Sequence, residues 1–412
     1  MKKALVVAGG IAQAALIHEL KSRGIFTILA DMNPNAVAVP HADRFYPIST
    51  MDVPALKQLA IDEKVDYVLT ACADQVLLVT VRISEELGLP TYLDYETAKI
   101  VSDKQYMKKR FVEAGVPTAK YAVMDRLDES KLAGFEYPLI VKPVDCYSSR
   151  GVRKVYGPEE LRTPFEEAVA LSRTGTATVE EFCEGEELTI DVYVENGIAH
   201  VLAVSISDKI GQEGRFVIYR TRHPSGQPQA ILDQIADTAQ RIADAFGLVD
   251  SPMLIQAISD DKRIRVLEFC ARTGGSIKFR LIKKASGFDV IKAAADLAEG
   301  KKPHVGALHS ESKYLINMFL YCKPGVFDHA EGFDELLKEG IVSEYYVFSA
   351  KGKKFGAVTC SGDRMGVYTV QADTVEELRQ KYETALGRVR AYDADGNDLI
   401  RRDMVTEPEF RV

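Results

Sequence analysis

Hydrophobic residues in the first hundred positions follow two alternating spacings. Continuous apolar runs, typical of buried parallel strands, occur at Ala4–Ala8, Phe26–Ala30 and Asp66–Thr70. Between these runs, apolar residues recur at helical spacing over Ile11–Arg23 and Pro54–Glu63. The succession of strand, helix and strand predicts a doubly wound α/β domain. We expect one further short strand at Pro90–Leu93.

The pattern changes after residue 102. Asp103 begins a predicted helix that runs to Ala114 and ends at Gly115-Val116-Pro117. Strands are then predicted at Tyr137–Pro143, Ala177–Phe182, Leu188–Val194, Ile198–Ser207, Met253–Ile258 and Ile264–Phe269, with a helix at Gln229–Phe246. The last two strands form an antiparallel pair across a turn, which places Gln256 and Glu268 on one face.

Beyond Lys302 the character changes again. Strands are predicted at Lys313–Tyr321, Ser343–Ser349 and Met365–Gln371, and an amphipathic helix at Thr374–Val389. These elements predict a small α+β domain at this end of the chain.

Composition narrows the class of protein. The chain has 412 residues, and its apolar content of 46% and charged content of 27% are typical of a soluble globular protein. A net charge of -8 argues against a nucleic-acid partner. The six cysteines include no CxxC pair, which favours reduced thiols in a cytoplasmic protein over disulfides or a zinc site. The first apolar run is too short for a signal peptide, and no run approaches a transmembrane helix.

The stretch from Arg265 to Ser276 combines an alternating strand with a glycine turn. The alternation predicts that Val266 and Glu268 share one face and that Leu267 and Phe269 share the other. Glu268 and Arg272 then stand four residues apart, where the strand leaves the core. They form either a surface ion pair or a site in which the carboxylate holds Mg2+ and the guanidinium holds a phosphate.

Other positions also allow two interpretations. Lys142 ends an apolar strand and is either a snorkelling edge residue or a phosphate ligand. The loop Val144–Gly151 is either an exposed hairpin or a cover for phosphates. Gly9-Gly10 with Asp31 lacks the third glycine of a dinucleotide fingerprint, so structural glycines are expected rather than an NAD site.

A basic stretch precedes the long helix of the middle region. Its residues Arg220, Arg222 and His223 could bind a substrate carboxylate. We favour the alternative, a solvated basic stretch. Arg280, after the glycine turn, is another candidate for the acceptor pocket.

A series of motifs joins these candidates in chain order. They are the glycine turn with Asp31-Met-Asn-Pro and His41-Ala-Asp43, Asp103-Lys104 before Gly115-Val116-Pro117, Tyr137–Pro143, Ser149–Val152, Glu180–Glu187, and Glu268 with Arg272. In this order and spacing, the chain resembles the ATP-grasp superfamily along nearly its whole length. It is similar to the halves of the carbamoyl phosphate synthetase large subunit, to biotin carboxylase and to L-amino-acid ligases.

The resemblance implies a role for each matching residue. Lys104 and Lys142 would contact ATP phosphates, Lys209 the γ-phosphate, and Arg272 the phosphoryl group in transfer. Gln256 and Glu268 would hold Mg2+, or Mn2+ in its place. The remaining nucleotide-binding positions would be a lid at Ser148, Ser149, Arg150 and Gly151, a hinge under adenine at Glu180, Glu181 and Phe182, and Glu187 at the ribose.

One departure from the family pattern concerns the metal. The family usually has Asn two residues after the second metal carboxylate, and this chain has Cys270. A thiol is a poor ligand for Mg2+, which prefers oxygen. Gln256 stands where Glu is common, and the lid has few glycines.

The resemblance implies an α/β N-terminal domain at 1–98, an α+β ATP-grasp module at 99–302 with its lid subdomain at about 115–183, and a small α+β C-terminal domain at 303–412. It implies a carboxylate–amine ligase that forms an acyl phosphate, with small-molecule carboxylate and amine substrates. The alternatives are a kinase-like phosphotransferase and a nucleotide-binding protein with weakened catalysis. We expect neither a nucleic-acid nor a membrane partner. A homodimer is compatible with the resemblance, and no sequence feature indicates one.

Overall fold

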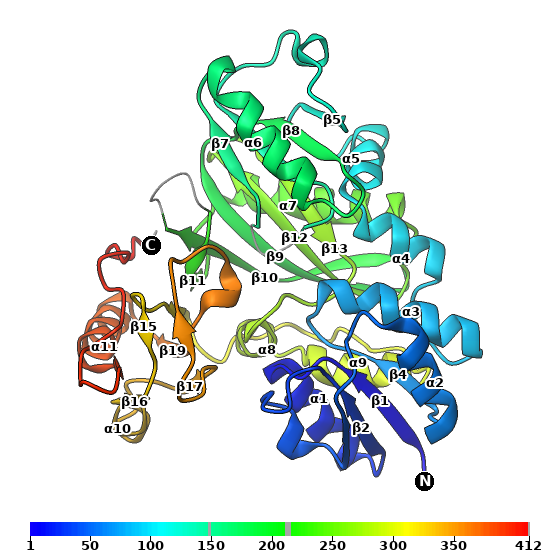
Figure 1. Ribbon diagram of the computed structural model, residues 1–412, viewed down its shortest axis with the longest axis vertical. Helices are drawn as coiled ribbons and strands as arrows, with labels where there is room; N and C mark the ends of the chain where they lie inside the picture. Colours follow the sequence, from blue (N-terminus) through cyan, green and yellow to red (C-terminus); the bar gives the residue numbers. More distant parts are fainter. Residues whose placement is uncertain (147–149, 211–215, 411–412) are drawn as a thin grey trace.

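The computed structural model describes residues 1–146, 150–210 and 216–410 (Figure 1). The N-terminal part is a parallel sheet in the order β3-β2-β1-β4. Its elements are β1 (Lys3–Val7), α1 (Ile11–Ser22), β2 (Phe26–Ala30), a 3-10 turn at Val39–His41, β3 (Arg44–Tyr46), α2 (Val53–Glu63), β4 (Tyr67–Leu69) and α3 (Asp74–Leu87). The strands predicted from the apolar runs are confirmed, because their side chains, such as Leu5, Ile28 and Val68, are buried beneath the helices.

The strand predicted at Pro90–Leu93 is wrong. This segment is a turn that leads into α4 (Tyr95–Ser102). Pro90 has no N–H to donate to a strand ladder. The Tyr92 hydroxyl instead donates a hydrogen bond of 2.9 Å to the carbonyl of Ala271. The segment therefore tethers the N-terminal part to the region around the glycine turn.

α5 (Lys104–Glu113) is the helix predicted from Asp103. The Asp103 carboxylate caps it by accepting from the backbone N–H groups of Gln105 and Tyr106. Beyond α5, an antiparallel sheet in the order β5-β8-β6-β7 lies at the top of Figure 1. It contains β5 (Tyr121–Met124), β6 (Leu139–Pro143), β7 (Arg153–Val155) and β8 (Ala177–Glu181), with a 3-10 turn at Glu129–Leu132, and α6 (Pro158–Leu171) packs against it.

The central sheet has the order β13-β12-β9-β10-β11-β14-β19-β17. Its first strands are β9 (Glu186–Glu195), β10 (Ile198–Lys209), β11 (Ile218–His223), β12 (Ser251–Ser259) and β13 (Ile264–Cys270). The antiparallel β12–β13 pair and the β9–β10 hairpin are confirmed. Apolar residues of α7 (Gln229–Ala245), such as Ile235 and Ile242, are buried on one face against Ile190 and Val192. α8 (Lys278–Ser286) and α9 (Val290–Ala298) follow the glycine turn.

The C-terminal strands extend this same sheet. β14 (Tyr314–Leu320) pairs with β11, and β19 (Gly366–Ala372) and β17 (Glu344–Val347) continue outward. The remaining elements are β15 (Gly325–Val326), β16 (His329–Glu331), α10 (Phe333–Lys338), β18 (Lys354–Phe355), a 3-10 turn at Ser361–Asp363, α11 (Val375–Arg388) and β20 (Arg390–Tyr392). The mixed fold class is confirmed, whereas the domain boundaries stay predictions. None of the described helices is long and apolar enough to cross a membrane.

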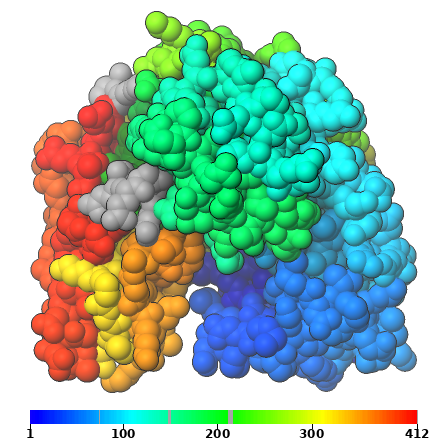
Figure 2. Space-filling model, turned by 45° about the horizontal axis from the view of Figure 1, so that its top comes forward, coloured from blue at the N-terminus to red at the C-terminus, as the bar shows by residue number. Residues whose placement is uncertain are grey.

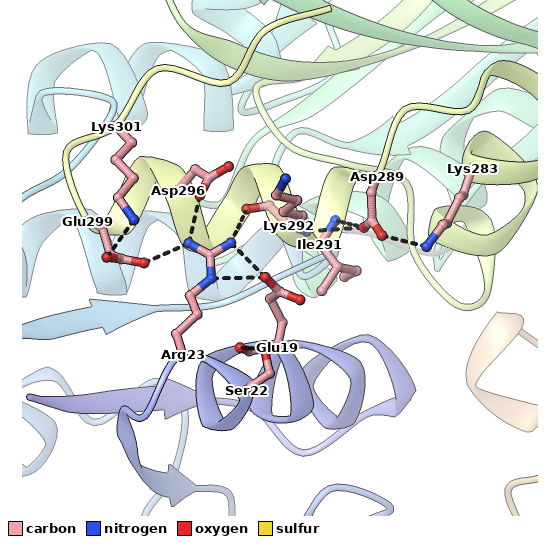
Figure 3. Close-up of polar contacts among 10 residues, drawn as sticks. All are labelled: Glu19, Ser22, Arg23, Lys283, Asp289, Ile291, Lys292, Asp296, Glu299 and Lys301. Atoms are coloured by element: carbon pink, nitrogen blue, oxygen red, sulfur yellow. Dashed lines mark hydrogen bonds and ion pairs between the residues drawn. The ribbon is translucent and has the colours of Figure 1, made fainter. Parts of the chain in front are cut away.

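A cluster of ion pairs joins α1 to α9 (Figure 3). The Arg23 guanidinium donates to Asp296 and Glu299 at 2.6 Å each, and to Glu19 on its own helix at 2.7 and 2.9 Å. It also donates to the carbonyl of Lys292 at 3.2 Å. Burial opposes the charge on Arg23, yet these carboxylates raise its pKa. The N-terminal part is therefore fixed against the helix that follows the glycine turn.

Candidate nucleotide and acceptor sites

A cavity of about 1040 Å3, including its mouth, lies between the β5-β8-β6-β7 sheet and the central sheet. The small sheet contributes Lys142 of β6 and Glu180 of β8, while Lys104 enters from the start of α5. The central sheet contributes Glu187, Lys209, Gln256, Leu267 and Glu268 from β9, β10, β12 and β13. Residues from well separated parts of the chain thus converge on one space.

A β-bulge decides which residues of β13 face this cavity. Gln256 pairs with Glu268, but the next residue, Ala257, pairs with Val266, so Leu267 is the extra residue. Leu267 and Glu268 both line the cavity, whereas Val266 is buried in the opposite core together with Phe269. The expected simple alternation along this strand is therefore wrong. The expectation that Gln256 and Glu268 share one face is confirmed.

Each cavity lysine lies beside a carboxylate. The ammonium of Lys104 is 3.2 Å from Glu268, and that of Lys142 is 2.8 Å from Glu180. Lys209 forms an ion pair with Glu187 across β9 and β10. Charges held away from water need such partners. A bound polyphosphate and a cation could replace these pairs, since the lysines match the phosphate and the carboxylates match the cation.

Lys108, which the sequence analysis missed, completes the buried part of this network. It is 3.1 Å from Glu180 and donates to the Thr118 hydroxyl at 2.7 Å. Burial alone would raise the pKa of Glu180, but Lys108 and Lys142 outweigh it and bring that pKa to about 2. Burial lowers the pKa of Lys108. The helical spacing of four residues from Lys104 was the signal that could have indicated Lys108.

An apolar end of the cavity lies next to the β8–β9 turn. The rings of Phe182 and Phe216 face it, with centroids 6.3 Å apart, and the ammonium of Lys154 lies 3.5 Å from the Phe182 ring centroid. The Phe182 N–H donates to the carbonyl of Pro138, which fixes the turn. Glu181 also lines the cavity. A flat aromatic ligand group suits this end, because aromatic rings stack on one another.

The predicted lid residues are only partly described. Ser148 and Ser149 lie outside the described residues. Arg150 lines the cavity, and Gly151 has a φ of +75°. A β-carbon at Gly151 would come within 2.9 Å of Pro143, so this turn requires glycine.

Arg272 is not among the residues that line the cavity. It lines a smaller cavity together with Tyr92. Its guanidinium donates to the carbonyl of Thr273 at 2.6 Å and lies 3.9 Å from the Cys270 sulfur. Glu268, Cys270 and Arg272 are spaced by two along β13 and the residues after it.

The oxygen donors present fit a metal ion that is held mainly by the phosphates of a bound molecule and by water. Within residues 1–146, 150–210 and 216–410, no group of three or more His, Cys, Asp and Glu side chains could hold a metal ion. Mg2+ in nucleotide sites is usually held by one or two carboxylates together with phosphates and waters. The adjacent Gln256 and Glu268 supply oxygen donors of that kind.

A wide cleft lies at the carboxyl ends of β1 and β4. Figure 2 shows the surface hollowed between the blue N-terminal part and the orange segment near residue 350. The cleft holds about 1680 Å3 of open space, and Lys351 and Arg364 line its C-terminal wall. β1 lies between β2 and β4 in the sheet, so the cleft is at the point where the strand order reverses. Ligands of open α/β sheets bind at such points.

Backbone strain gathers around this cleft. Ala8, Cys72 and Ser276 line it, and all have positive φ angles, of +79°, +60° and +59°. Non-glycine residues rarely adopt that conformation, and they concentrate at functional sites. Ser361 lines both the cleft and the cavity described above, so the two spaces meet there.

Asp31 supports the turn at Gly9-Gly10, which lines this cleft. Its carboxylate accepts from the N–H groups of Gly9 and Asn33, at 2.8 Å each. A β-carbon at Gly9 would lie 2.6 Å from that of Ala36, so close packing requires this glycine. These contacts agree with the interpretation of structural glycines.

The favoured interpretation of Arg220, Arg222 and His223 as a solvated stretch is wrong. They belong to β11; Arg220 and Arg222 are buried and both bind Asp208. Packing of β11 between β10 and β14 encloses them. The Nδ1 of His223 lies 3.1 Å from the carbonyl of Val204, and burial lowers its pKa to about 4. Neither they nor Arg280 line the cavity or the cleft.

Comparison with known proteins finds two family models that each match part of this chain. Residues 135–279 match the ATP-grasp domain, and residues 318–392 match the L-amino acid ligase C-terminal domain 2. The formate-dependent phosphoribosylglycinamide formyltransferase of Cupriavidus necator is 30% identical over 256 residues, which are 59% of this chain and 62% of that protein. The chain thus spans less than two thirds of the length of the curated relatives it matches.

Solved structures extend the likeness in fold. The L-amino acid ligase from Bacillus licheniformis superposes with a TM-score of 0.78 at 18% identity, covering 95% of this chain and 98% of that one. The biotin carboxylase domain of the Hydrogenobacter thermophilus 2-oxoglutarate carboxylase, solved with MgADP and bicarbonate, gives 0.78 at 18% identity, covering 97% and 91%. At these identities the likeness concerns the fold.

Proposed function

We propose that this chain, whose residues 135–279 form an ATP-grasp domain, is an ATP-dependent ligase that joins a small carboxylic acid to an amine through an acyl phosphate. One observation carries the proposal. Gln256 and Glu268 stand side by side in a cavity that Lys104, Lys142 and Lys209 also enter. That combination of oxygen donors and cations suits a nucleoside triphosphate with its metal ion.

Each residue of the cavity would have its own role in binding ATP and Mg2+. Lys104 and Lys142 hold phosphates from opposite sides of the cavity, and Lys209 contacts the γ-phosphate. Gln256 and Glu268 would hold Mg2+, which neutralises charge on the phosphates when bound. Glu187 reaches the ribose, while Phe182 and Phe216 enclose the base. These contacts orient the γ-phosphate and stabilise its charge, which is the main requirement of phosphoryl transfer.

The chemistry balances without a protein nucleophile. A substrate carboxylate oxygen attacks the γ-phosphorus, the bond to the bridging oxygen breaks, and ADP leaves. The amine then attacks the acyl carbon, loses a proton and releases inorganic phosphate. Arg272 would steady the phosphoryl group, which requires its guanidinium to leave the carbonyl of Thr273 and turn toward the cavity.

The cleft at the ends of β1 and β4 is the proposed acceptor site. It meets the nucleotide cavity at Ser361, so an acceptor could reach the γ-phosphate from that side. Lys351 and Arg364 on one wall favour an acid as the occupant, because each carries a positive charge. The amine would enter the same cleft after the acid.

The test is a matrix of amino and carboxylic acids against amines, assayed for ATP-dependent release of inorganic phosphate and for the amide product. We expect at least one pair to give phosphate and amide in equal amounts. Lys142→Ala should weaken ATP binding in calorimetry, and Lys131→Ala, an exposed lysine of the same region, serves as the matched control. Failure of ATP to bind the unaltered chain would overturn the proposal.

Cys270 supports a second candidate, a nucleotide-binding protein with weakened catalysis. A thiol near the metal position supplies a poor ligand for Mg2+. This candidate predicts tight ATP binding without turnover in any combination of acid and amine. A kinase-like phosphotransferase, which would keep the same nucleotide contacts, would yield a stable phosphorylated acceptor instead of free phosphate.

A further inference from the structure

Asp208 forms a buried ion cluster beside the nucleotide cavity. Its carboxylate accepts from Arg222 at 2.8 and 2.9 Å and from Arg220 at 2.5 Å. Asp208 is the neighbour of Lys209 on β10, and successive residues of a strand face opposite sides of the sheet. The cluster therefore lies on the side of β10 away from the cavity that Lys209 enters.

A distant part of the chain covers this cluster. The segment from Met404 to Phe410, called here the 404–410 segment, lies against β11. Arg220 donates to the carbonyl of Thr406 at 2.7 Å, and Arg222 donates to the carbonyl of Glu409. The ring of Phe410 meets that of Tyr314 edge to face at 6.1 Å, and the Arg222 guanidinium lies 5.9 Å from its centroid.

Electrostatics explains why the cluster needs this cover. Arg220 and Arg222 share the Asp208 carboxylate, and Arg222 also lies 3.7 Å from Glu186, so two buried guanidiniums depend on partly buried carboxylates for their charge. Burying a charge is costly unless polar groups satisfy it. The carbonyl oxygens of the 404–410 segment supply such groups. The cluster and the segment therefore stabilise each other.

The strand ladder between β10 and β11 is irregular immediately before Lys209. The register between β10 and β11 shifts between Asp208 and Lys209, where Lys209 pairs with Ile218. A shift of this kind bends a strand and interrupts the ladder. The side-chain bonds of Asp208 thus add a constraint on β10 immediately before Lys209, beside the ladder pairs.

We propose that Asp208, Arg220, Arg222 and the 404–410 segment form a latch that positions Lys209 in the nucleotide cavity. Asp208 and the arginines act as positioning residues, since they line neither the cavity nor the cleft. The inference rests on the proposed function through the contact of Lys209 with the γ-phosphate. It predicts that loosening the latch selectively weakens recognition of that phosphate.

The test compares ATP with ADP binding by calorimetry, because only ATP carries the γ-phosphate. Lys209→Ala should lower the preference for ATP over ADP by about tenfold, the usual effect of one hydrogen bond to a charged group. Arg222→Met keeps the bulk of the side chain and leaves Asp208 paired with Arg220, so the fold should survive. Arg222→Met should lower the preference in the same sense.

The decisive measurement is the combination of Arg222→Met with Lys209→Ala. A latch that acts through Lys209 predicts that the combined variant loses no more preference than Lys209→Ala alone. Independent, additive losses would overturn the latch. Phe410→Ala, which loosens the segment by removing its ring contacts with Tyr314 and Arg222, should repeat the pattern. Arg401→Gln, whose side chain pairs with Asp403, is the control and should change nothing.

The outcomes separate the latch from the proposed function. If the unaltered chain binds neither nucleotide, the proposed function fails. If it binds ATP with a clear preference that Arg222→Met and Phe410→Ala leave intact, the latch alone is overturned. Both variants should still bind ADP, since the contacts of Phe182 and Phe216 with the base do not involve the latch.

Discussion

Leu267 decides which side of the sheet carries the carboxylate that follows it. The composition of β13 indicates a strand, and its pairing with β12 followed from the turn between them. The extra residue could not be predicted, because a bulge depends on how two strands fit together rather than on either strand alone. The pairing of Gln256 with Glu268 nevertheless agreed with the sequence, since the bulge begins just beyond that pair.

Glu268→Gln tests the metal assignment. The amide keeps the size of the side chain but removes the charge that a divalent cation requires. We expect phosphate release to fall at least about a hundredfold at limiting Mg2+, a loss typical of a group that stabilises a charged transition state. The melting temperature should stay close to that of the unaltered chain. Glu184→Gln, an exposed carboxylate after the hinge, is the control, and normal turnover of Glu268→Gln at limiting Mg2+ contradicts the assignment.

Cys270→Asn tests the departure from the family pattern. An amide oxygen is a better ligand for Mg2+ than a thiol, so the variant should reach half-maximal activity at a lower Mg2+ concentration. Asn is only slightly larger than Cys, so the packing cost should stay below about 1.5 kcal/mol. Titration with Mg2+ and thermal melting on the same protein check both expectations. An unchanged Mg2+ requirement together with a large fall in melting temperature would show that the side chain belongs to the core.

At the scale of elements, the sequence was sufficient to predict a helix or strand wherever the cap or the apolar spacing lies within that element itself. α5 was predicted because Asp103 caps it, and α7 because its apolar stripe is continuous. The prediction that the basic residues of β11 are exposed to solvent was wrong. Charged residues of this kind are usually exposed, and these are buried only because β11 pairs with β10 and β14. Their partner Asp208 lies on another strand, and no local pattern indicates such a contact.

The low pKa of His223, on β11, leads to a prediction about stability in acid. Burial lowers the pKa of His223 to about 4 from 6.5, so the folded chain binds this proton less readily than the unfolded chain. The resulting stability is present above pH 6.5 and is lost as the pH falls from about 6.5 toward 4. His223→Gln should reduce the difference in unfolding free energy between pH 7 and pH 4.5 by on the order of 2 kcal/mol.

Urea unfolding at the two pH values measures that difference. His329→Gln is the matched control, because His329 is exposed and its pKa is raised by Asp328 and Glu331. A raised pKa acts in the opposite sense, so this control should not reduce acid sensitivity. Equal acid sensitivity of His223→Gln and the unaltered chain contradicts the prediction.

At the scale of the whole molecule, the proposed acceptor cleft depends on contacts that the sequence could not reveal. One wall belongs to the N-terminal sheet and the other to the region around residue 350. The order of the motifs indicated the nucleotide cavity, because each motif lies within one short segment. The cleft instead requires the placement of the N-terminal part, which is fixed by side chains far apart in the chain, as Arg23 and Asp296 show.

Arg23→Gln tests this dependence of the cleft on docking. The substitution removes the cation shared by Glu19, Asp296 and Glu299 and leaves these carboxylates facing one another (Figure 3). Like charges at such distances repel, so α1 should separate slightly from α9. We expect the KM for the acceptor acid to rise by about three- to tenfold, because misplacement of one wall weakens contacts made in the cleft. The Kd for ATP should not change, since the nucleotide cavity contains no residue of the N-terminal sheet.

Lys21→Gln, on the same helix but paired with Asp43 inside the N-terminal part, is the control. Hydrogen exchange should quicken in α1 and α9 of Arg23→Gln alone, and a rise in the Kd for ATP equal to that in the acceptor KM would refute a separate acceptor cleft.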